Sequence, residues 1–181
     1  MARAATARLE TERLVLRMFR PGDFEPYALM CADPDVTRYL GDGRPLTRQE
    51  TWRQMAMILG HWRLRRYGLW AVEERATGAF MGRIGLFNPE GWPGFELGWV
   101  LGKAHWGRGY ATEGARRVLE HAFTDLGIAH LISLIHPDNV ASIRVAERIG
   151  ERFESHTLLF GRQVLVYGID RPGGGNLERV T

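Results

Sequence analysis

A glycine-rich stretch decides the fold: residues 106–113 read Trp-Gly-Arg-Gly-Tyr-Ala-Thr-Glu. The stretch lies between a short apolar run, 95–101, and an amphipathic helical pattern that reaches about residue 126. A turn therefore stands where a strand passes into the N-terminus of a helix. Free backbone N–H groups and the positive end of the helix dipole make such a corner a site for phosphate. Gly107 and Gly109 would let the backbone approach an anion, although a corner of this kind can also need glycine for geometry alone.

A second strand-to-helix junction follows about thirty residues later. Residues 136–142 read His-Pro-Asp-Asn-Val-Ala-Ser, follow the apolar run 130–135 and open a helix that ends near Gly150. Asn139 and Ser142 are one helical turn apart, so their side chains share a face at the start of this helix. They could contact a ligand there, or Asn139 could act only as a cap for the first helix amides.

Together the two junctions resemble the acyl-CoA-binding core of the GNAT N-acyltransferases, and more closely the branch that acetylates ribosomal-protein N-termini. The resemblance runs from about Thr11 to about Asp170 and rests on the order of the parts. Residues 106–111 occupy the place of the family's Gln/Arg-x-x-Gly-x-Gly/Ala loop, with Trp106 in place of the usual first residue. The resemblance implies an acyl-CoA N-acyltransferase domain over 11–170. Residues 171–181, with three consecutive glycines, are expected to form a flexible C-terminal tail.

The same resemblance implies the ligands. Acetyl-CoA is the expected co-substrate, with no metal, and the acceptor is a primary amine on a protein N-terminus or a small molecule. The pyrophosphate is expected on the backbone amides of the loop, where Lys103, Arg108 and Arg144 could add charge. The implied cofactor-binding residues are Trp99, Val100, Leu101, Trp106, Gly107, Arg108, Gly109, Tyr110, Ala111, Thr112, Asn139 and Ser142.

Glu96 is the candidate general base. A carboxylate is unexpected on a strand as apolar as 95–101, because burying it unpaired is costly. If it faces the cleft, partial desolvation raises its pKa toward the range in which it can take a proton from an amine. Its position matches the family's basic glutamate. The competing interpretation is an exposed strand glutamate or an ion pair with an arginine.

The resemblance also implies that strand 95–101 splays from its neighbour. A free N–H near Trp99 or Val100 would then stabilise the oxyanion, and Gly98 is compatible with a bulge at that point.

The general acid stays open. Ala146 stands where many relatives carry a tyrosine, and Leu134 stands where some carry a glutamate. Ser142, expected near the thiol, or a water molecule is the remaining choice. Tyr39 is a candidate for the acceptor side, since the first two helices form that wall in relatives.

Composition limits the class of protein. The 181 residues are 45% hydrophobic and 25% charged, as in one soluble α/β domain. The net charge is only +3, and the arginines are scattered, which argues against a nucleic-acid partner. No apolar run is long enough for a membrane span or a secretory signal. Cys31 is the only cysteine, which fits a reducing cytoplasm and offers no acyl carrier near the motifs. A homodimer is compatible with these numbers.

Hydrophobic periodicity predicts a mixed, mostly antiparallel sheet of six to seven strands with helices on both faces. The expected strands are 14–19, 69–73, 79–87, 95–101, 130–136, 152–159 and 162–169, and 75–78 is a hairpin turn. A helix is expected through about Cys31, and a capping box of Thr47 and Glu50 opens another with Trp52, Met55, Ile58 or Leu59, and Trp62 on one side. The helix after the glycine loop should bury Ala115, Val118, Leu119, Ala122 and Leu126, and the last helix covers 139–149.

The favoured function is therefore an acetyl-CoA-dependent N-acetyltransferase that works by direct attack in a ternary complex. A dinucleotide-binding enzyme is disfavoured, because its third glycine would fall where Thr112 stands. A non-catalytic acyl-CoA-binding or sensing module remains the alternative, since no strong general acid is identified.

Overall fold

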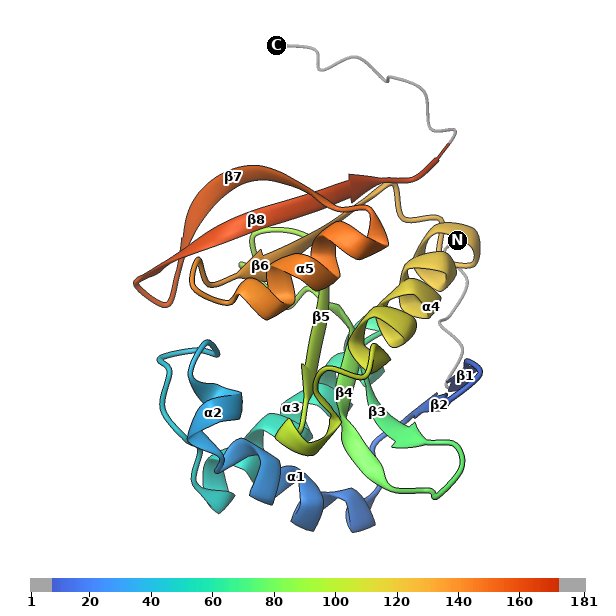
Figure 1. Ribbon diagram of the computed structural model, residues 1–181, viewed down its shortest axis with the longest axis vertical. Helices are drawn as coiled ribbons and strands as arrows, with labels where there is room; N and C mark the ends of the chain where they lie inside the picture. Colours follow the sequence, from blue (N-terminus) through green and yellow to red (C-terminus); the bar gives the residue numbers. More distant parts are fainter. Residues whose placement is uncertain (1–7, 173–181) are drawn as a thin grey trace.

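One mixed sheet with helices in front of it and behind it organises the chain (Figure 1). The structure is a computed structural model that describes residues 8–172. Eight strands lie in the order β1-β2-β3-β4-β5-β6-β8-β7, and every neighbouring pair is antiparallel except β5 and β6. Their bounds are β1 Arg8–Glu10, β2 Leu14–Arg17, β3 Leu69–Glu74, β4 Phe80–Phe87, β5 Glu96–Leu101, β6 His130–Ile135, β7 Arg152–Leu159 and β8 Arg162–Asp170.

The fold class predicted from the sequence is confirmed, with one strand more than expected. The additional strand is β1, whose three residues are too few to produce a period-two pattern. At the C-terminal end of the described residues, the backbone N–H of Arg171 donates to the carbonyl of Ala129 at 2.8 Å. Residues 173–181 of the predicted tail lie outside the described residues.

The helices occupy both faces of the sheet, as expected. They are η1 Pro21–Asp23, α1 Phe24–Cys31, α2 Pro34–Thr37, α3 Arg48–Arg65, η2 Lys103–His105, α4 Tyr110–Thr124 and α5 Val140–Ile149. In Figure 1, α4 and α5 lie side by side in front of the sheet, and α3 passes behind β5. Helix α2 was not predicted; it is a single turn, capped by the side chain of Asp33. Within residues 8–172, no helix combines the length and the apolar character that crossing a membrane requires.

Helix α3 begins at the predicted capping box, but its buried face differs from the prediction. The Thr47 hydroxyl accepts from the Glu50 N–H, and the Glu50 carboxylate accepts from the Thr47 N–H. Thr51, Met55, Ile58 and Trp62 form the buried stripe, whereas Trp52 is 61% exposed. The expectation that Trp52 packs inward is wrong, because one residue is about 100° around the helix axis from its neighbour.

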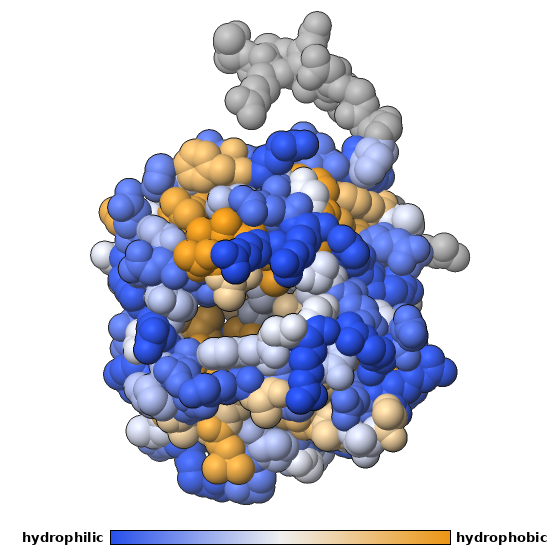
Figure 2. Space-filling model, in the orientation of Figure 1, coloured by the Kyte–Doolittle hydropathy of each residue, from blue (hydrophilic) through white to orange (hydrophobic). Residues whose placement is uncertain are grey.

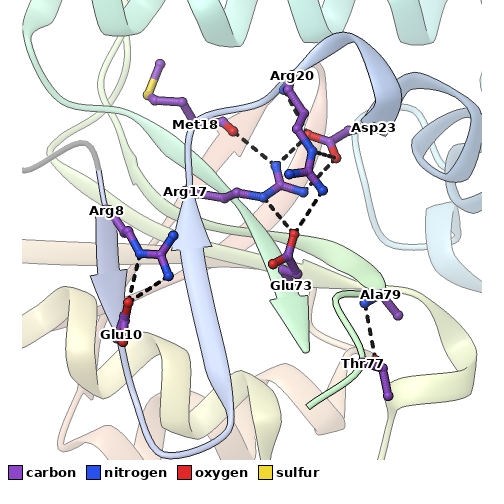
Figure 3. Close-up of polar contacts among 9 residues, drawn as sticks. All are labelled: Arg8, Glu10, Arg17, Met18, Arg20, Asp23, Glu73, Thr77 and Ala79. Carbon is purple, nitrogen blue, oxygen red and sulfur yellow. Dashed lines mark hydrogen bonds and ion pairs between the residues drawn. The ribbon is translucent and has the colours of Figure 1, made fainter. Parts of the chain in front are cut away.

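A buried ion-pair network fastens the first helices to the sheet (Figure 3). Arg17 on β2 makes two hydrogen bonds to Asp23, of 2.7 and 2.8 Å, and a third to Glu73 on β3. The side chains of Arg17 and Asp23 are only 11% and 3% exposed. Planar bidentate pairing of this kind fixes orientation as well as distance. The network thereby holds η1, and with it α1, at the edge of the sheet.

The sheet opens between its two parallel strands. β5 and β6 share a single register pair, Glu96 with Ile132, in which the Ile132 N–H donates to the Phe95 carbonyl at 2.9 Å. β4 and β5, by contrast, stay paired from Glu96 to Leu101 without a shift in register. The bulge considered at Gly98 is therefore absent, and the chain splays on the β6 side only. Figure 1 shows the two strands diverging, and Figure 2 shows the same face hollowed near its middle.

Candidate active site

The corner between β5 and α4 presents free amides to solvent. Gly107 and Gly109 have φ angles of +72° and +80°, values that favour glycine. No atom lies within 4 Å of where a Cβ would stand on Gly107. Within the described part of the chain, none of the backbone N–H groups of residues 107–112 donates a hydrogen bond to a protein atom. The first helical bond of α4 is made by Glu113, to the Gly109 carbonyl. This arrangement fits a bound anion.

An arginine far away in the sequence braces this corner. Arg13 pairs with Glu113 on α4 at 2.6 Å, donates to the carbonyl of Arg108 at 3.0 Å and lies 4.4 Å from the centre of the Tyr110 ring. Glu113 also accepts a hydrogen bond from the Thr11 hydroxyl. This contact could not be predicted from local sequence patterns, because the partners are 100 residues apart.

The three cations predicted to add charge at the loop differ in their surroundings. Lys103 is exposed and pairs with Asp35 of α2 at 2.5 Å. Arg144 is exposed on α5, and Arg108 is exposed in the loop itself. Of the three, Arg108 therefore lies directly beside the free amides.

β5 and β6 separate at one branch point, where a hydrogen bond of the parallel ladder is missing. After the pair Glu96 and Ile132, a continuing parallel ladder would join the Leu134 N–H to the Leu97 carbonyl. Instead, the Leu97 carbonyl accepts from the hydroxyl of Ser133 at 2.7 Å, while the backbone of Leu134 lies near enough to the Glu96 carboxyl to help lower its pKa. A side chain thus replaces the Leu134 N–H as the partner of the Leu97 carbonyl.

Beyond this branch point, backbone groups of β5 face the gap. The carbonyls of Phe95 and Leu97 both point toward β6, so the alternation of a strand turns Trp99 and Leu101 the same way and Val100 toward β4. The carbonyl of Leu101 accepts from the indole of Trp106 at 2.8 Å. Of the two candidates for a free N–H, the geometry therefore selects Trp99.

Glu96 lies at the branch point with an altered acidity. Its carboxyl accepts a hydrogen bond from the indole N–H of Trp92 at 2.7 Å. Desolvation raises its pKa to about 7, against the lowering effects of Trp92, the positive charge of Arg83 and the backbone of Leu134. A carboxyl with this pKa exchanges its proton near neutral pH, as a general base must. Trp92 could not be assigned to this role from the sequence, since it lies in an irregular loop.

The start of α5 faces the same gap. Asn139 caps the helix, accepting from the Ser142 N–H at 3.2 Å. The hydroxyl oxygen of Ser142 accepts a hydrogen bond of 3.3 Å from the indole of Trp99 on β5. The structure thus brings Ser142 and Trp99 together across the opening, while the capping interpretation of Asn139 is correct. Ala146, one turn further, is fully buried.

A small pocket lies on the opposite side of β5, against the first helices. It has a volume of about 80 Å³. Its lining includes Cys31, Leu40, Asp42, Gln54, Arg83 and Val100. Within residues 8–172, Arg83 has no carboxylate at ion-pair distance, whereas Arg44 in the same lining pairs with Asp42 and Glu50. Tyr39 does not line this pocket; its ring stacks on His136 at the end of β6, 5.1 Å between centres.

Comparison with known proteins identifies the family. The family described as "Acetyltransferase (GNAT) domain" matches residues 13–152. YkkB of Bacillus subtilis strain 168 is 33% identical over 171 residues, covering 90% of this chain and 95% of that protein. Other relatives, from Bacillus species, are named as N-acetyltransferases.

Solved structures of acetyltransferases are similar to this chain. An acetyltransferase from Agrobacterium tumefaciens is similar with a TM-score of 0.81 and 34% identity, over 91% of this chain and 95% of that one. RimL, a ribosomal L7/L12 alpha-N-protein acetyltransferase in complex with coenzyme A, shares the fold with a TM-score of 0.74 and 17% identity, over 88% and 95% of the two chains. The ribosomal-protein branch is thus represented among the chain's structural neighbours. The chain belongs to the GNAT acetyltransferase family, which uses acetyl-CoA, and is an N-acetyltransferase.

Proposed function

We propose that the protein transfers the acetyl group of acetyl-CoA to a primary amine by direct attack in a ternary complex. One observation carries the proposal: a half-buried carboxyl with a pKa of about 7, that of Glu96, lies where a splayed strand edge begins. Free amides for a diphosphate lie beyond the end of the same strand. The acceptor amine, the general base and the acetyl thioester can then come together where the gap between β5 and β6 begins.

The backbone of the α4 corner is suited to hold the diphosphate. The amides of 107–112, the helix dipole and Arg108 all favour a dianion. The pantetheine arm would replace β6 as the partner of β5, pairing with the N–H and C=O groups of Trp99. A strand edge with unpaired amides supports this role, because such groups need a partner once water is excluded.

Residues of β5 would supply the chemistry at the acetyl carbonyl. The N–H of Trp99 stabilises the negative charge that develops on the carbonyl oxygen. Glu96, ionised, takes a proton from the attacking amine directly or through water. The new bond forms between the amine nitrogen and the acetyl carbon while the carbon–sulfur bond breaks.

Ser142 is proposed to act on the departing sulfur. Its oxygen already accepts the Trp99 indole hydrogen, so its own hydroxyl hydrogen is free to donate to the thiolate. The proton that Glu96 removes from the amine balances the proton that the free thiol finally carries. Direct attack is supported by Cys31, which is only 5% exposed, and burial raises the pKa of its thiol.

A thiol-release assay tests the proposal. The protein is incubated with acetyl-CoA and a panel of amines: peptides with free N-termini, an aminoglycoside, a polyamine and amino-acid derivatives. Free thiol should appear only with an accepting amine and in equal amount to an acetylated product measured by mass spectrometry. Tight binding of acetyl-CoA by calorimetry with no thiol released from any amine would favour the sensing module instead.

A further inference from the structure

A buried carboxyl lies behind the branch point of β5 and β6. Glu151, between α5 and β7, is 2% exposed. Its Oε1 lies 2.9 Å from the hydroxyl oxygen of Ser133 on β6, and its Oε2 has no partner among the described residues. The hydroxyl oxygen of Ser133 is also 2.7 Å from the Leu97 carbonyl. A chain of three oxygens therefore runs from Leu97 to Glu151.

The proton count along this chain determines the state of Glu151. Each of the two short oxygen–oxygen contacts needs one hydrogen between its atoms. A serine hydroxyl carries only one hydrogen, and a carbonyl carries none. Because Ser133 gives its hydrogen to Leu97, the hydrogen of the second contact belongs to Glu151. Glu151 is therefore a neutral carboxylic acid that donates to Ser133.

The burial of Glu151 also favours its neutral form. An ionised carboxylate here would leave one charged oxygen without a partner in a closed interior, which costs far more than an unpaired neutral oxygen. Desolvation raises the pKa of Glu151 to about 8, and the nearby charges of Glu96 on β5 and Glu154 on β7 act in the same direction. The other polar residues around it are Glu147 on α5, Arg152 on β7 and Tyr167 on β8.

We infer that Glu151 is a positioning residue for acetyl transfer: as a carboxylic acid it fixes Ser133 on the Leu97 carbonyl and so holds β5 and β6 apart where the thioester must enter. The inference rests on the proposed function. Ser133 occupies the Leu97 carbonyl, so this carbonyl is not available to the Leu134 N–H. Without this occupation, the Leu134 N–H is free to pair with the Leu97 carbonyl and lengthen the ladder by one step. The opening between β5 and β6 would then narrow.

Four variants and a pH profile test the inference. Glu151→Leu and Ser133→Ala each break the chain of oxygens, and kcat/KM for acetyl-CoA should fall on the order of tenfold. Glu151→Gln keeps an uncharged donor and should restore most of what Glu151→Leu loses. Above a pH of about 8 the natural protein should lose activity, because Glu151 ionises, while Glu151→Gln should not. Glu147→Gln, exposed on α5, serves as the control and should follow the natural profile.

A spectroscopic readout separates this inference from the proposed function. In Glu96→Gln, which removes the other carboxyl that is partly protonated at neutral pH, the infrared band of a protonated carboxyl should be present at pH 7 and should vanish when Glu151→Gln is added. A band that is unchanged by this addition, or the same alkaline loss of activity in Glu151→Gln, overturns the inference. If no variant turns over any amine, the proposed function fails, and the infrared band together with acetyl-CoA affinity in Ser133→Ala still decides the inference. Circular dichroism verifies that Glu151→Leu is folded, and Ser133→Ala repeats the test with a smaller change in volume.

Discussion

Glu96 shows how opposing effects set one acidity. Removing a carboxylate from water raises its pKa, while an indole N–H, a backbone hydrogen bond and a nearby guanidinium lower it. The result is a pKa of about 7, between that of an exposed glutamate and that of an unpaired buried one. With fewer donors, the pKa of this carboxyl would be higher and a smaller fraction of it would be ionised at neutral pH.

The first prediction concerns this residue. Glu96→Gln should lower kcat/KM by about 10² to 10⁴ and abolish the acidic limb whose midpoint lies at a pH of about 7, because the group that must lose a proton is gone. Steady-state rates from pH 5 to 9 measure both effects. Glu90→Gln changes a fully exposed glutamate in the preceding loop and should leave the limb in place. A surviving limb in Glu96→Gln would assign it to another group.

Arg83 offers a second test at the same scale. Its positive charge lowers the pKa of Glu96, so Arg83→Gln should move the acidic limb to higher pH. Arg83 also lines the pocket against the first helices. Arg44→Gln in the same pocket is the matched control, because Arg44 is not among the groups that shift Glu96. Equal pH profiles for Arg83→Gln and the natural protein would contradict the electrostatic argument.

Glu151 predicts a dependence of stability on pH. The folded pKa, about 8, is above the ordinary value of 4.5, so between these values only the folded state retains the proton. The contribution of this group is complete below pH 4.5 and is lost as the pH rises through about 8. From pH 5 to pH 8, Glu151→Gln should therefore gain on the order of 3 kcal/mol in free energy of unfolding relative to the natural protein. Urea unfolding at the two pH values measures this, and parallel changes in both proteins would refute it.

At the scale of elements, the glycine corner combines backbone conformations that favour glycine with open space around Gly107. Gly107 and Gly78 have nearly the same φ, +72° and +74°, and no atom within 4 Å of a Cβ on either. Gly78, however, follows the turn between β3 and β4. The two glycines therefore lie in different places, but a residue with a Cβ would meet the same backbone strain at either position.

This pair gives a matched prediction. Gly107→Ala and Gly78→Ala should each lose about 1 kcal/mol of stability, the cost of a positive φ with a Cβ. Only Gly107→Ala should also weaken acetyl-CoA binding, because its Cβ would stand where the diphosphate approaches the amides. Thermal unfolding and calorimetric titration provide the two measurements. Equal acetyl-CoA affinities in the two variants would show that residue 107 does not face the ligand.

What the sequence could predict were features that depend on neighbours along the chain. The glycine turn, the Thr47 and Glu50 capping box and the strand that carries Glu96 are of this kind, and each is found where expected. Hydrophobic periodicity also predicted the long helices. Local patterns suffice there because a few consecutive residues determine the conformation.

What the sequence could not predict depends on contacts between distant segments. Glu151 and Ser133 meet only because α5 returns the chain to β6, and Arg13 reaches Glu113 across the sheet. The splay itself was expected from the resemblance, but the absence of a bulge at Gly98 follows from β4, which pairs with β5 throughout. No pattern in one segment reports such partners.

At the scale of the whole molecule, the sheet consists of two parts that meet at one register pair. β1 to β5 lie on one side of Glu96 and Ile132, and β6 to β8 lie on the other. The segment after α2 also contacts the second part, where Tyr39 stacks on His136 and where Arg162 of β8 donates to the Gly41 carbonyl at 3.2 Å. The hollow in Figure 2 lies between these halves. A ligand that fills the gap would therefore join two parts of the sheet that have few bonds of their own.

Hydrogen exchange tests this arrangement directly. Acetyl-CoA should slow exchange in two separate places, the amides of residues 107–112 and the N–H groups of Trp99 and Leu101, because none of these groups has an acceptor within residues 8–172. The β1–β4 amides, already paired, should change little. At one hundred times its dissociation constant, acetyl-CoA should also add about 2.7 kcal/mol to the free energy of unfolding. Protection confined to the loop, with Trp99 and Leu101 unchanged, would mean that the cofactor is anchored at the corner without entering the gap, and the assignment of Trp99 as oxyanion donor would then fall.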